Sequence, residues 1–251
     1  LRQLEQMTDG SAGGDNVTMP LLDHFRPPLS EQRHWHSFHN SWATYLSSQL
    51  NAVLPEGFFA EANVQFGIEI DVAALEGRGA VWNPKSAWVP PQPQSTLPVE
   101  LSGNRVEINI FSRSGGSQLA GAIELVSPAN KDRPAHRDAL VSKCASYINA
   151  GVGLVLVDVV TERSWDFHRD LLRRLGTDVV ESDSLAASSY RPVEREGKQS
   201  LDVWYEPLEL GGTLPTLPLW LRGGYCLPVE LESTYERTCS EQRLRVVSEA
   251  A

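Results

Sequence analysis

Three acidic residues are the first candidates for chemistry in this sequence. Glu124 interrupts the apolar run GAIELV, Asp158 interrupts the apolar run VGLVLVDVV, and Asp71 ends a segment in which apolar and polar residues alternate. Because an unpaired carboxylate is costly to bury, such a group must be protonated, hydrogen-bonded, ion-paired or bound to a metal ion. Asp158 is interpreted as structural. Glu124 is followed directly by the polar loop SPANKDRP, which favours a functional role.

A lysine could complete a hydrolytic site around Asp71 and Glu124. Lys143 lies in the helical segment that follows Glu124, and Lys131 in SPANK is the competing lysine. Carboxylate oxygens are ligands that Mg²⁺ prefers, and an ammonium group can stabilise charge that develops on a phosphate. Each residue also has a structural interpretation: a solvated turn at Asp71, an ion-paired or backbone-bonded Glu124, and a solvated helix surface at Lys143.

The elements that must position these residues include a strand–helix–strand unit. GAIELV and VGLVLVDVV are apolar on both faces, and residues 135–150 between them have the spacing of a helix that ends at Gly151. Strands that are apolar on both faces belong in the centre of a sheet. We therefore expect two parallel central strands joined by a right-handed helical crossover.

The first helix and the alternating segment come before this unit. Apolar residues recur at helical spacing from Trp35 to Val53, so a helix is predicted from about Ser30 until just before Pro55. His39 on this helix could lie over the site as an outer metal ligand or a base, or could hydrogen-bond to hold the helix on the sheet. Residues 61–72 predict one bent strand, or two strands separated at Gly67.

The remaining elements are predicted more coarsely. Residues 76–98 contain five prolines and two tryptophans, which predicts a segment without regular structure that serves as a lid or a surface wrap. Residues 106–125 predict a hairpin that turns at SRSGGS. Beyond the central unit, we expect a helix at 165–175, a loop at 178–189, a strand at 200–208 and an extended C-terminal strip with a final helical turn.

Composition indicates one globular domain. The 251 residues are 41% hydrophobic and 22% charged, which argues against a disordered or disulfide-dense protein. Residues 1–18 are interpreted as a flexible extension and residues 19–251 as the domain. The apolar runs are too short to cross a bilayer and the first residues lack a signal pattern, so we expect a cytoplasmic location and no membrane partner. The three scattered cysteines fit neither a zinc ribbon nor a disulfide framework.

The charge distribution bears on nucleic acid as a partner. The net charge of −10 disfavours non-specific binding by the whole surface. Residues 131–174 contain eight lysines and arginines and six acidic residues, a net charge of +2 that leaves −12 for the rest of the chain. The basic stretch therefore flanks the candidate site, as a groove that follows a phosphate backbone requires, although a solvated helix face would give the same count.

Several motifs resemble known families. GAIELVSPANK, the helix with Lys143 and Tyr147, and GVGLVLVDVV together resemble the PD-(D/E)XK, restriction-endonuclease-like superfamily. Residues 19 to about 245 are similar to the bacterial domain-of-unknown-function family 4058. The matching motifs are MPLLDHFRPP, WxxFH with Trp35, Phe38 and His39, EIDVA, ELVSPANKDRP, the GV-to-DVV strand, LPTLPLWL and PVELESTYE.

The resemblance implies an α/β fold with a restriction-endonuclease-like core. This core is a helix, three strands, a helix and a strand around a central mixed sheet, here with a C-terminal extension. Asp71 takes the place of the motif's Asp and Glu124 that of its (D/E), so these two and the Leu125 carbonyl would be the metal ligands. Val126 stands where the motif has its lysine. Lys143 fits a lysine moved to the following helix, and Lys131 is its competitor.

Three functions remain open at this stage. The first is a Mg²⁺- or Mn²⁺-dependent phosphodiesterase that acts on nucleic acid. The second is a fold of the same kind that has lost its activity and binds protein or nucleic acid. The third is a hydrolase or binding protein for a small phosphorylated or sugar ligand, with residues 76–98 as a lid. Many restriction-like enzymes are homodimers, but no residue pattern here marks an interface.

Overall fold

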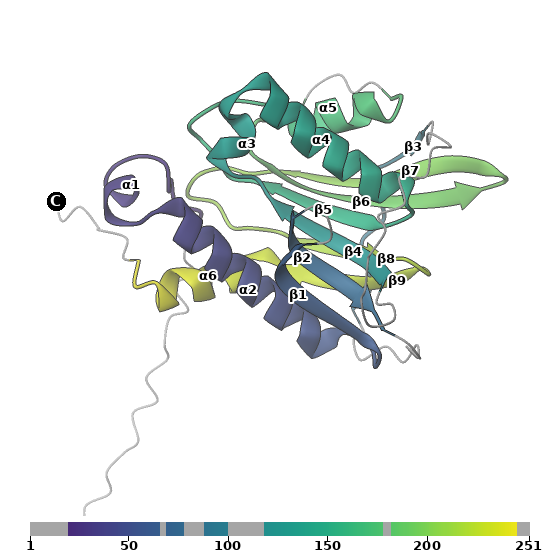
Figure 1. Ribbon diagram of the computed structural model, residues 1–251, viewed down its shortest axis with the longest axis horizontal. Coiled ribbons are helices and arrows are strands. Elements are labelled where there is room, and N and C mark those ends of the chain that lie inside the picture. Colours follow the sequence, from purple (N-terminus) through teal and green to yellow (C-terminus); the bar gives the residue numbers. More distant parts are fainter. Residues whose placement is uncertain (1–19, 66–68, 78–87, 100–117, 178–181, 245–251) are drawn as a thin grey trace, which may run out of the picture.

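The computed structural model describes residues 20–65, 69–77, 88–99, 118–177 and 182–244. Within these ranges the chain forms a mixed α/β fold with six helices, a seven-stranded sheet and a two-stranded sheet (Figure 1). In chain order the elements are α1 (Leu29–Gln32), α2 (Trp35–Val53), β1 (Phe58–Gln65), β2 (Glu69–Glu76), β3 (Ser95–Pro98), β4 (Gln118–Leu125), α3 (Pro128–Asp132), α4 (Pro134–Asn149), β5 (Gly153–Asp158), α5 (Phe167–Arg174), β6 (Ala186–Arg195), β7 (Lys198–Pro207), β8 (Thr216–Leu221), β9 (Tyr225–Glu230) and α6 (Leu231–Glu241).

The seven-stranded sheet has the order β1-β2-β4-β5-β6-β7-β3. The prediction of two central parallel strands is confirmed, because β4 and β5 pair in parallel in the middle of the sheet while all other neighbouring pairs are antiparallel. Helices α3 and α4 form the crossover between these two strands. Gly151 ends this crossover with φ of 76°, a conformation that glycine adopts without strain.

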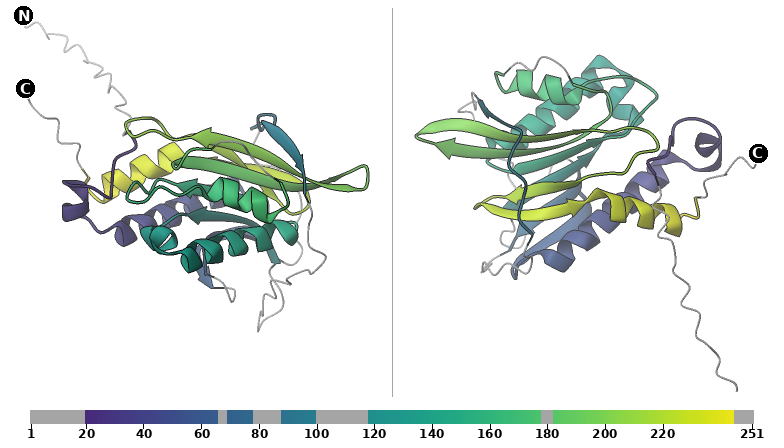
Figure 2. Two further views of the ribbon diagram at one scale, coloured as in Figure 1. Left: turned by 90° about the horizontal axis from the view of Figure 1, so that it is seen from above. Right: turned by 180° about the vertical axis from the view of Figure 1, so that it is seen from behind.

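Two layers cover the sheet on opposite faces (Figures 1 and 2). Helices α4 and α5 pack on one face, where Leu154 and Leu156 of β5 are buried. Helices α2 and α6 and the β8–β9 sheet pack on the other face, where Val155 and Val157 are buried. Both faces of β5 therefore lie in a core, as its continuous apolar sequence predicts.

The predictions for the first helix and for the alternating segment are confirmed with one correction. The alternating segment forms two antiparallel strands, β1 and β2, rather than one bent strand. The first helix ends at Val53 as predicted, but α2 begins at Trp35 and not near Ser30. Arg33 and His34 have extended backbone conformations, which separate the short α1 from α2.

Other predictions were wrong in detail. Ser95–Pro98 lies in the segment predicted to lack regular structure, yet it forms the edge strand β3 against β7, a position where proline is tolerated. Strand β6 begins at Ala186, inside the predicted loop. The C-terminal strip is a hairpin, β8–β9, followed by the eleven-residue helix α6 rather than by a single turn. The predicted strand at 200–208 is confirmed, because β7 lies in the main sheet beside β6.

Some predictions fall on residues that the structure does not describe. These are the N-terminal extension and most of the predicted hairpin before Gln118, together with residues 78–87 of the proline-rich segment. In the described part of the chain, no helix is both long and apolar enough to cross a membrane.

Candidate functional site

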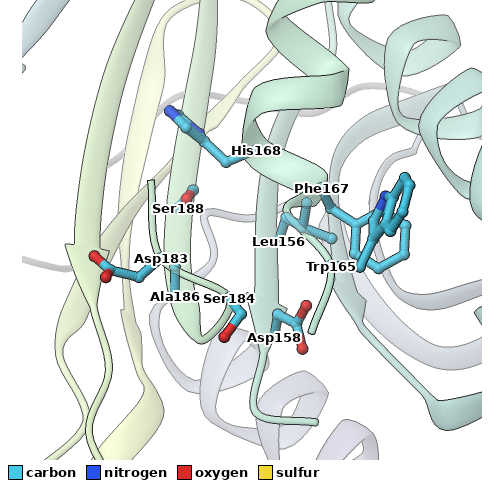
Figure 3. A pocket seen from close by; sticks show the side chains of 9 residues that line it. All are labelled: Leu156, Asp158, Trp165, Phe167, His168, Asp183, Ser184, Ala186 and Ser188. Carbon is cyan, nitrogen blue, oxygen red and sulfur yellow. The ribbon is translucent and has the colours of Figure 1, made fainter. Parts of the chain in front are cut away.

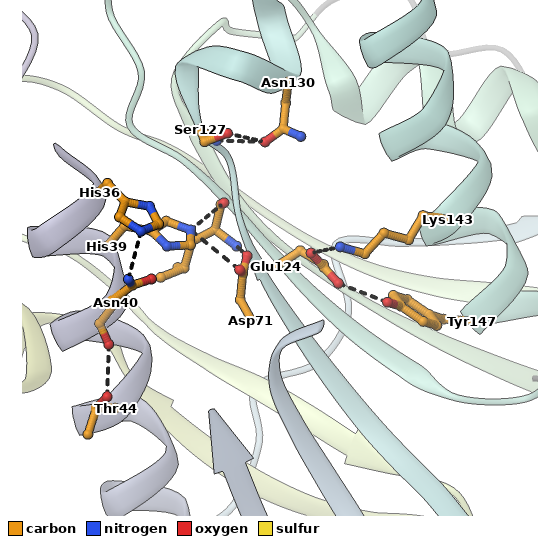
Figure 4. Close-up of polar contacts among 11 residues, drawn as sticks. His36, His39, Asn40, Thr44, Asp71, Glu124, Ser127, Asn130, Lys143 and Tyr147 are labelled. Atoms are coloured by element: carbon orange, nitrogen blue, oxygen red, sulfur yellow. Dashed lines mark hydrogen bonds and ion pairs between the residues drawn. The ribbon is translucent and has the colours of Figure 1, made fainter. Parts of the chain in front are cut away.

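Asp71 and Glu124 lie side by side on adjacent strands of the sheet. In the pairing of β2 with β4, Val72 is opposite Ile123, so the next step of this register brings Asp71 to Glu124. Both residues are buried, with exposed fractions of 8% for Asp71 and 2% for Glu124. The structure therefore brings together the two carboxylates that the sequence selected (Figure 4).

Helix α4 supplies both partners of the Glu124 carboxylate. The Lys143 ammonium donates to Oε2 of Glu124 at 2.6 Å, and the Tyr147 hydroxyl donates to Oε1 at 2.9 Å. Lys143 and Tyr147 are four residues apart and so share one face of the helix. The sequence proposed Lys143 as a lysine of the site and left Lys131 as its competitor. Tyr147 was not selected as a site residue, although its spacing from Lys143 is a signal that would have found it.

Burial increases the affinity of the Glu124 carboxylate for a proton or a cation. Burial raises the pKa of Glu124 to about 8, although the charge of Lys143 opposes this rise. Burial lowers the pKa of Lys143, but the adjacent Glu124 carboxylate outweighs burial, and the pKa of Lys143 lies above its ordinary value. Removal of Lys143 would leave a buried carboxylate without a cationic partner.

His39 and Asp71 both contact the peptide group of Leu125. The Leu125 N–H donates to Oδ2 of Asp71 at 2.8 Å, and the His39 Nε2 lies 3.1 Å from the Leu125 carbonyl oxygen. The same Nε2 is 3.5 Å from Oδ1 of Asp71. Burial lowers the pKa of His39, but Asp71 and the Leu125 carbonyl outweigh burial and raise it overall. His39 thus lies at the site and also ties α2 to the sheet, and its contact with Leu125 matches the interpretation in which it holds the helix on the sheet.

Lys131 belongs to a different cluster. Its side chain is fully buried, and its ammonium donates to Asp158 at 2.8 Å and to the Val160 carbonyl at 2.8 Å. Burial raises the pKa of Asp158 to about 7, and the charge of Lys131 opposes this rise. Lys143, and not Lys131, is therefore the lysine at Glu124, and the structural interpretation of Asp158 agrees with its ion pair.

A small hollow adjoins this second cluster at the carboxyl end of β5 (Figure 3). Asp158, His168, Ser184 and Ser188 are among its lining residues. Oδ2 of Asp158 is buried and has no hydrogen-bond partner within the described ranges. Burial lowers the pKa of His168 to about 4, and its Nδ1 is 2.6 Å from the Tyr190 hydroxyl. No sequence pattern pointed to this hollow.

The oxygen atoms around Asp71 and Glu124 have the chemistry that Mg²⁺ and Mn²⁺ prefer. They are the four carboxylate oxygens and the Leu125 carbonyl oxygen, and each contacts an N–H, O–H or ammonium group of the protein. Among the described residues, no group of three or more His, Cys, Asp or Glu side chains is arranged to hold a metal ion. The donor types fit a divalent ion, provided that some of the present partners give way.

Comparisons with protein-family models, curated proteins and solved structures found no match to this chain. The resemblance described above therefore stays a prediction.

Proposed function

We propose that this protein is a Mg²⁺- or Mn²⁺-dependent phosphodiesterase that acts on nucleic acid and has a restriction-endonuclease-like core. The order of elements supports this core. Helix α2, strands β1, β2 and β4, helix α4 and strand β5 occur in this order in the chain, with β3 inserted after β2 and the short α3 before α4. The four strands are neighbours in the same order in the sheet. This arrangement agrees with the helix, three strands, helix and strand that the sequence motifs imply. Strand β3 lies at the opposite edge.

The single observation that carries the proposal is the convergence of Asp71, Glu124 and Lys143. Two carboxylates from adjacent strands meet an ammonium group from the crossover helix, with 2.6 Å between Lys143 Nζ and Glu124 Oε2. Asp71, Glu124 and the Leu125 carbonyl would hold the divalent ion. When bound, the ion would activate water and neutralise negative charge on the phosphate.

The other residues of the site have roles that follow from their contacts. Tyr147 donates to Oε1 of Glu124 and so fixes the orientation of the carboxylate. Lys143 pairs with Oε2 in the absence of substrate. Its side chain is 18% exposed, compared with 2% for Glu124, so its ammonium is the group that can turn toward a phosphate and stabilise the transition state.

A second candidate function, a binding module without catalysis, is favoured by a different observation. All five candidate ligand oxygens already contact protein donors, and Val126 replaces the motif lysine. The basic stretch is also largely neutralised, because at least six of its eight cationic side chains lie within ion-pair distance of a carboxylate. They are Lys131, Arg133, Lys143, Arg163, Arg169 and Arg174.

Titration of Mn²⁺ into the metal-free protein by calorimetry tests the proposal. We expect saturable binding that is lost in Asp71→Asn and in Glu124→Gln, because each change removes an anionic ligand. Asp202→Asn is the matched control, since Asp202 of β7 is an equally buried carboxylate that pairs with Arg195 of β6.

The outcomes separate the two candidate functions. Binding that survives both site variants would reject Asp71 and Glu124 as ligands. Absence of binding in the unchanged protein would favour the binding module. Binding that is lost only in the two site variants would justify a screen for metal-dependent cleavage of DNA and RNA.

A further inference from the structure

We propose that the His39 ring occupies the binding position of the divalent ion in the metal-free protein. The ion would then bind only when the ring moves away from Leu125 and Asp71. This inference rests on the metal site of the proposed function. It assigns to His39 the role of an internal competitor of the ion, in contrast to that of a ligand.

The position of the His39 hydrogen follows from its acceptors. Nε2 faces the Leu125 carbonyl oxygen at 3.1 Å and Oδ1 of Asp71 at 3.5 Å (Figure 4). Neither a carbonyl nor a carboxylate can donate a hydrogen bond, so Nε2 must carry the hydrogen in this arrangement. A ring nitrogen that bears hydrogen has no lone pair for a metal, and His39 as placed here cannot be a ligand through Nε2.

This hydrogen and a divalent ion would require the same space. The hydrogen of an N–H···O bond lies about 1.9–2.0 Å from its acceptor. A Mg²⁺ ion lies about 2.0–2.1 Å from each of its oxygen ligands. The two oxygens that His39 faces are two of the candidate ligand atoms, so the imidazole N–H supplies them with the positive partner that the ion would supply. An ion between these oxygens would meet the N–H at far less than contact distance.

Displacement of the ring is a local change. The ring is also edge-on to Trp35, with 6.0 Å between the ring centroids, and its further polar neighbour, Asn40, is on the same helix. The His39 side chain is 11% exposed, whereas that of Glu124 is 2% exposed. The ring can therefore move toward solvent while both strands keep their positions.

Calorimetric titration of Mn²⁺ into the unchanged protein, His39→Ala and His36→Ala tests the inference. His36 is the matched control because it is an exposed histidine on the same helix that contacts Asn40 and not the carboxylates. We expect His39→Ala to bind Mn²⁺ about tenfold more tightly, as the loss of one competing charge-assisted hydrogen bond implies. We expect His36→Ala to match the unchanged protein.

Each other outcome has a definite meaning. Weaker binding by His39→Ala would show that His39 is a ligand and would overturn the inference, and equal binding would overturn it as well. Both results would leave the proposed metal site standing. If none of the three proteins binds Mn²⁺, the proposed function fails, and the inference fails with it. Binding by His39→Ala alone would support the inference, because the ion would then bind only where the ring is absent.

A second measurement needs no variant, which matters because His39 also holds α2 on the sheet. The ring N–H of His39 can be followed by ¹⁵N-edited NMR in the unchanged protein while diamagnetic Mg²⁺ is added. We expect the hydrogen-bonded Nε2–H signal to disappear as the site fills. Persistence of this signal at a Mg²⁺ concentration that calorimetry shows to be saturating would overturn the inference.

Discussion

At the scale of single residues, Glu124 is the feature from which the rest of the site follows. Its carboxylate is buried on a central strand, and its two oxygens have separate donors, Lys143 and Tyr147, from one face of α4. A buried carboxyl group with a raised proton affinity keeps its charge only beside a cation. In the metal-free protein that cation is the Lys143 ammonium. In the proposed enzyme a divalent ion would also neutralise the Glu124 carboxylate.

A change of Lys143 to methionine tests this dependence. We expect Lys143→Met to lower the free energy of unfolding by about 3 kcal/mol, because it leaves the buried Glu124 carboxyl group without its cationic partner. The double variant Glu124→Gln with Lys143→Met should recover much of this loss. Urea unfolding of the variants measures both effects, and the exposed Lys198→Met serves as the control. A Lys143→Met protein as stable as the unchanged protein would contradict the role of the pair.

At the scale of elements, the β8–β9 hairpin shows why two glycines stand in the central strands. A Cβ on Gly153 of β5 would overlap the backbone carbonyl of Trp220 in β8. A Cβ on Gly121 of β4 would come within 2.7 Å of Leu221 Cδ2, the end of a flexible side chain. The hairpin therefore crosses the sheet at a distance that only glycine permits at position 153.

The two glycines predict an order of destabilisation. We expect Gly153→Ala to lower the free energy of unfolding by about 3 kcal/mol, because a strand backbone must move. Gly121→Ala should be less destabilising, because the Leu221 side chain can rotate away. Thermal or urea unfolding of the two variants provides the comparison. If Gly121→Ala were the more harmful change, the close packing of β8 on β5 would be in doubt.

At the scale of the whole molecule, buried histidines make stability depend on pH. Burial lowers the pKa of His24 and of His168 to about 4 from the ordinary 6.5. The unfolded chain therefore takes up protons before the folded chain does as pH falls. The stability that these neutral histidines contribute is fully present above pH 6.5 and is lost as pH falls toward 4.

His168 allows this effect to be isolated from that of other groups. Between pH 7.5 and 4.5, the unchanged protein should lose about 2–3 kcal/mol of stability relative to His168→Gln, as the lowered pKa of His168 implies. Urea unfolding of both proteins at the two pH values measures the difference. Both proteins contain the same buried carboxyl groups, so the contributions of these groups to the pH dependence cancel. A difference that does not vary with pH would show that His168 is not held neutral in the fold.

The sequence by itself determined the central unit of this fold. Continuous apolar runs specify central strands, helical spacing between them specifies the crossover, and a parallel pair requires one. These local patterns were sufficient to place β4, α4 and β5 and to identify Glu124 as a buried acid. The pattern of α2 was equally clear, although the start of the helix depended on the extended backbone of Arg33 and His34.

The partners of the buried charges were decided only by the tertiary structure. Lys131 and Lys143 both follow Glu124 in sequence, but α3 leaves the end of β4 and carries Lys131 to Asp158, whereas α4 returns across the sheet and brings Lys143 to Glu124. The contact of His39 with Leu125 spans 86 residues. Periodicity reports which face of an element is buried, but it contains no information on which distant residue packs there. For that reason the sequence identified the charged groups, and the packing of the helices on the sheet determined their pairs.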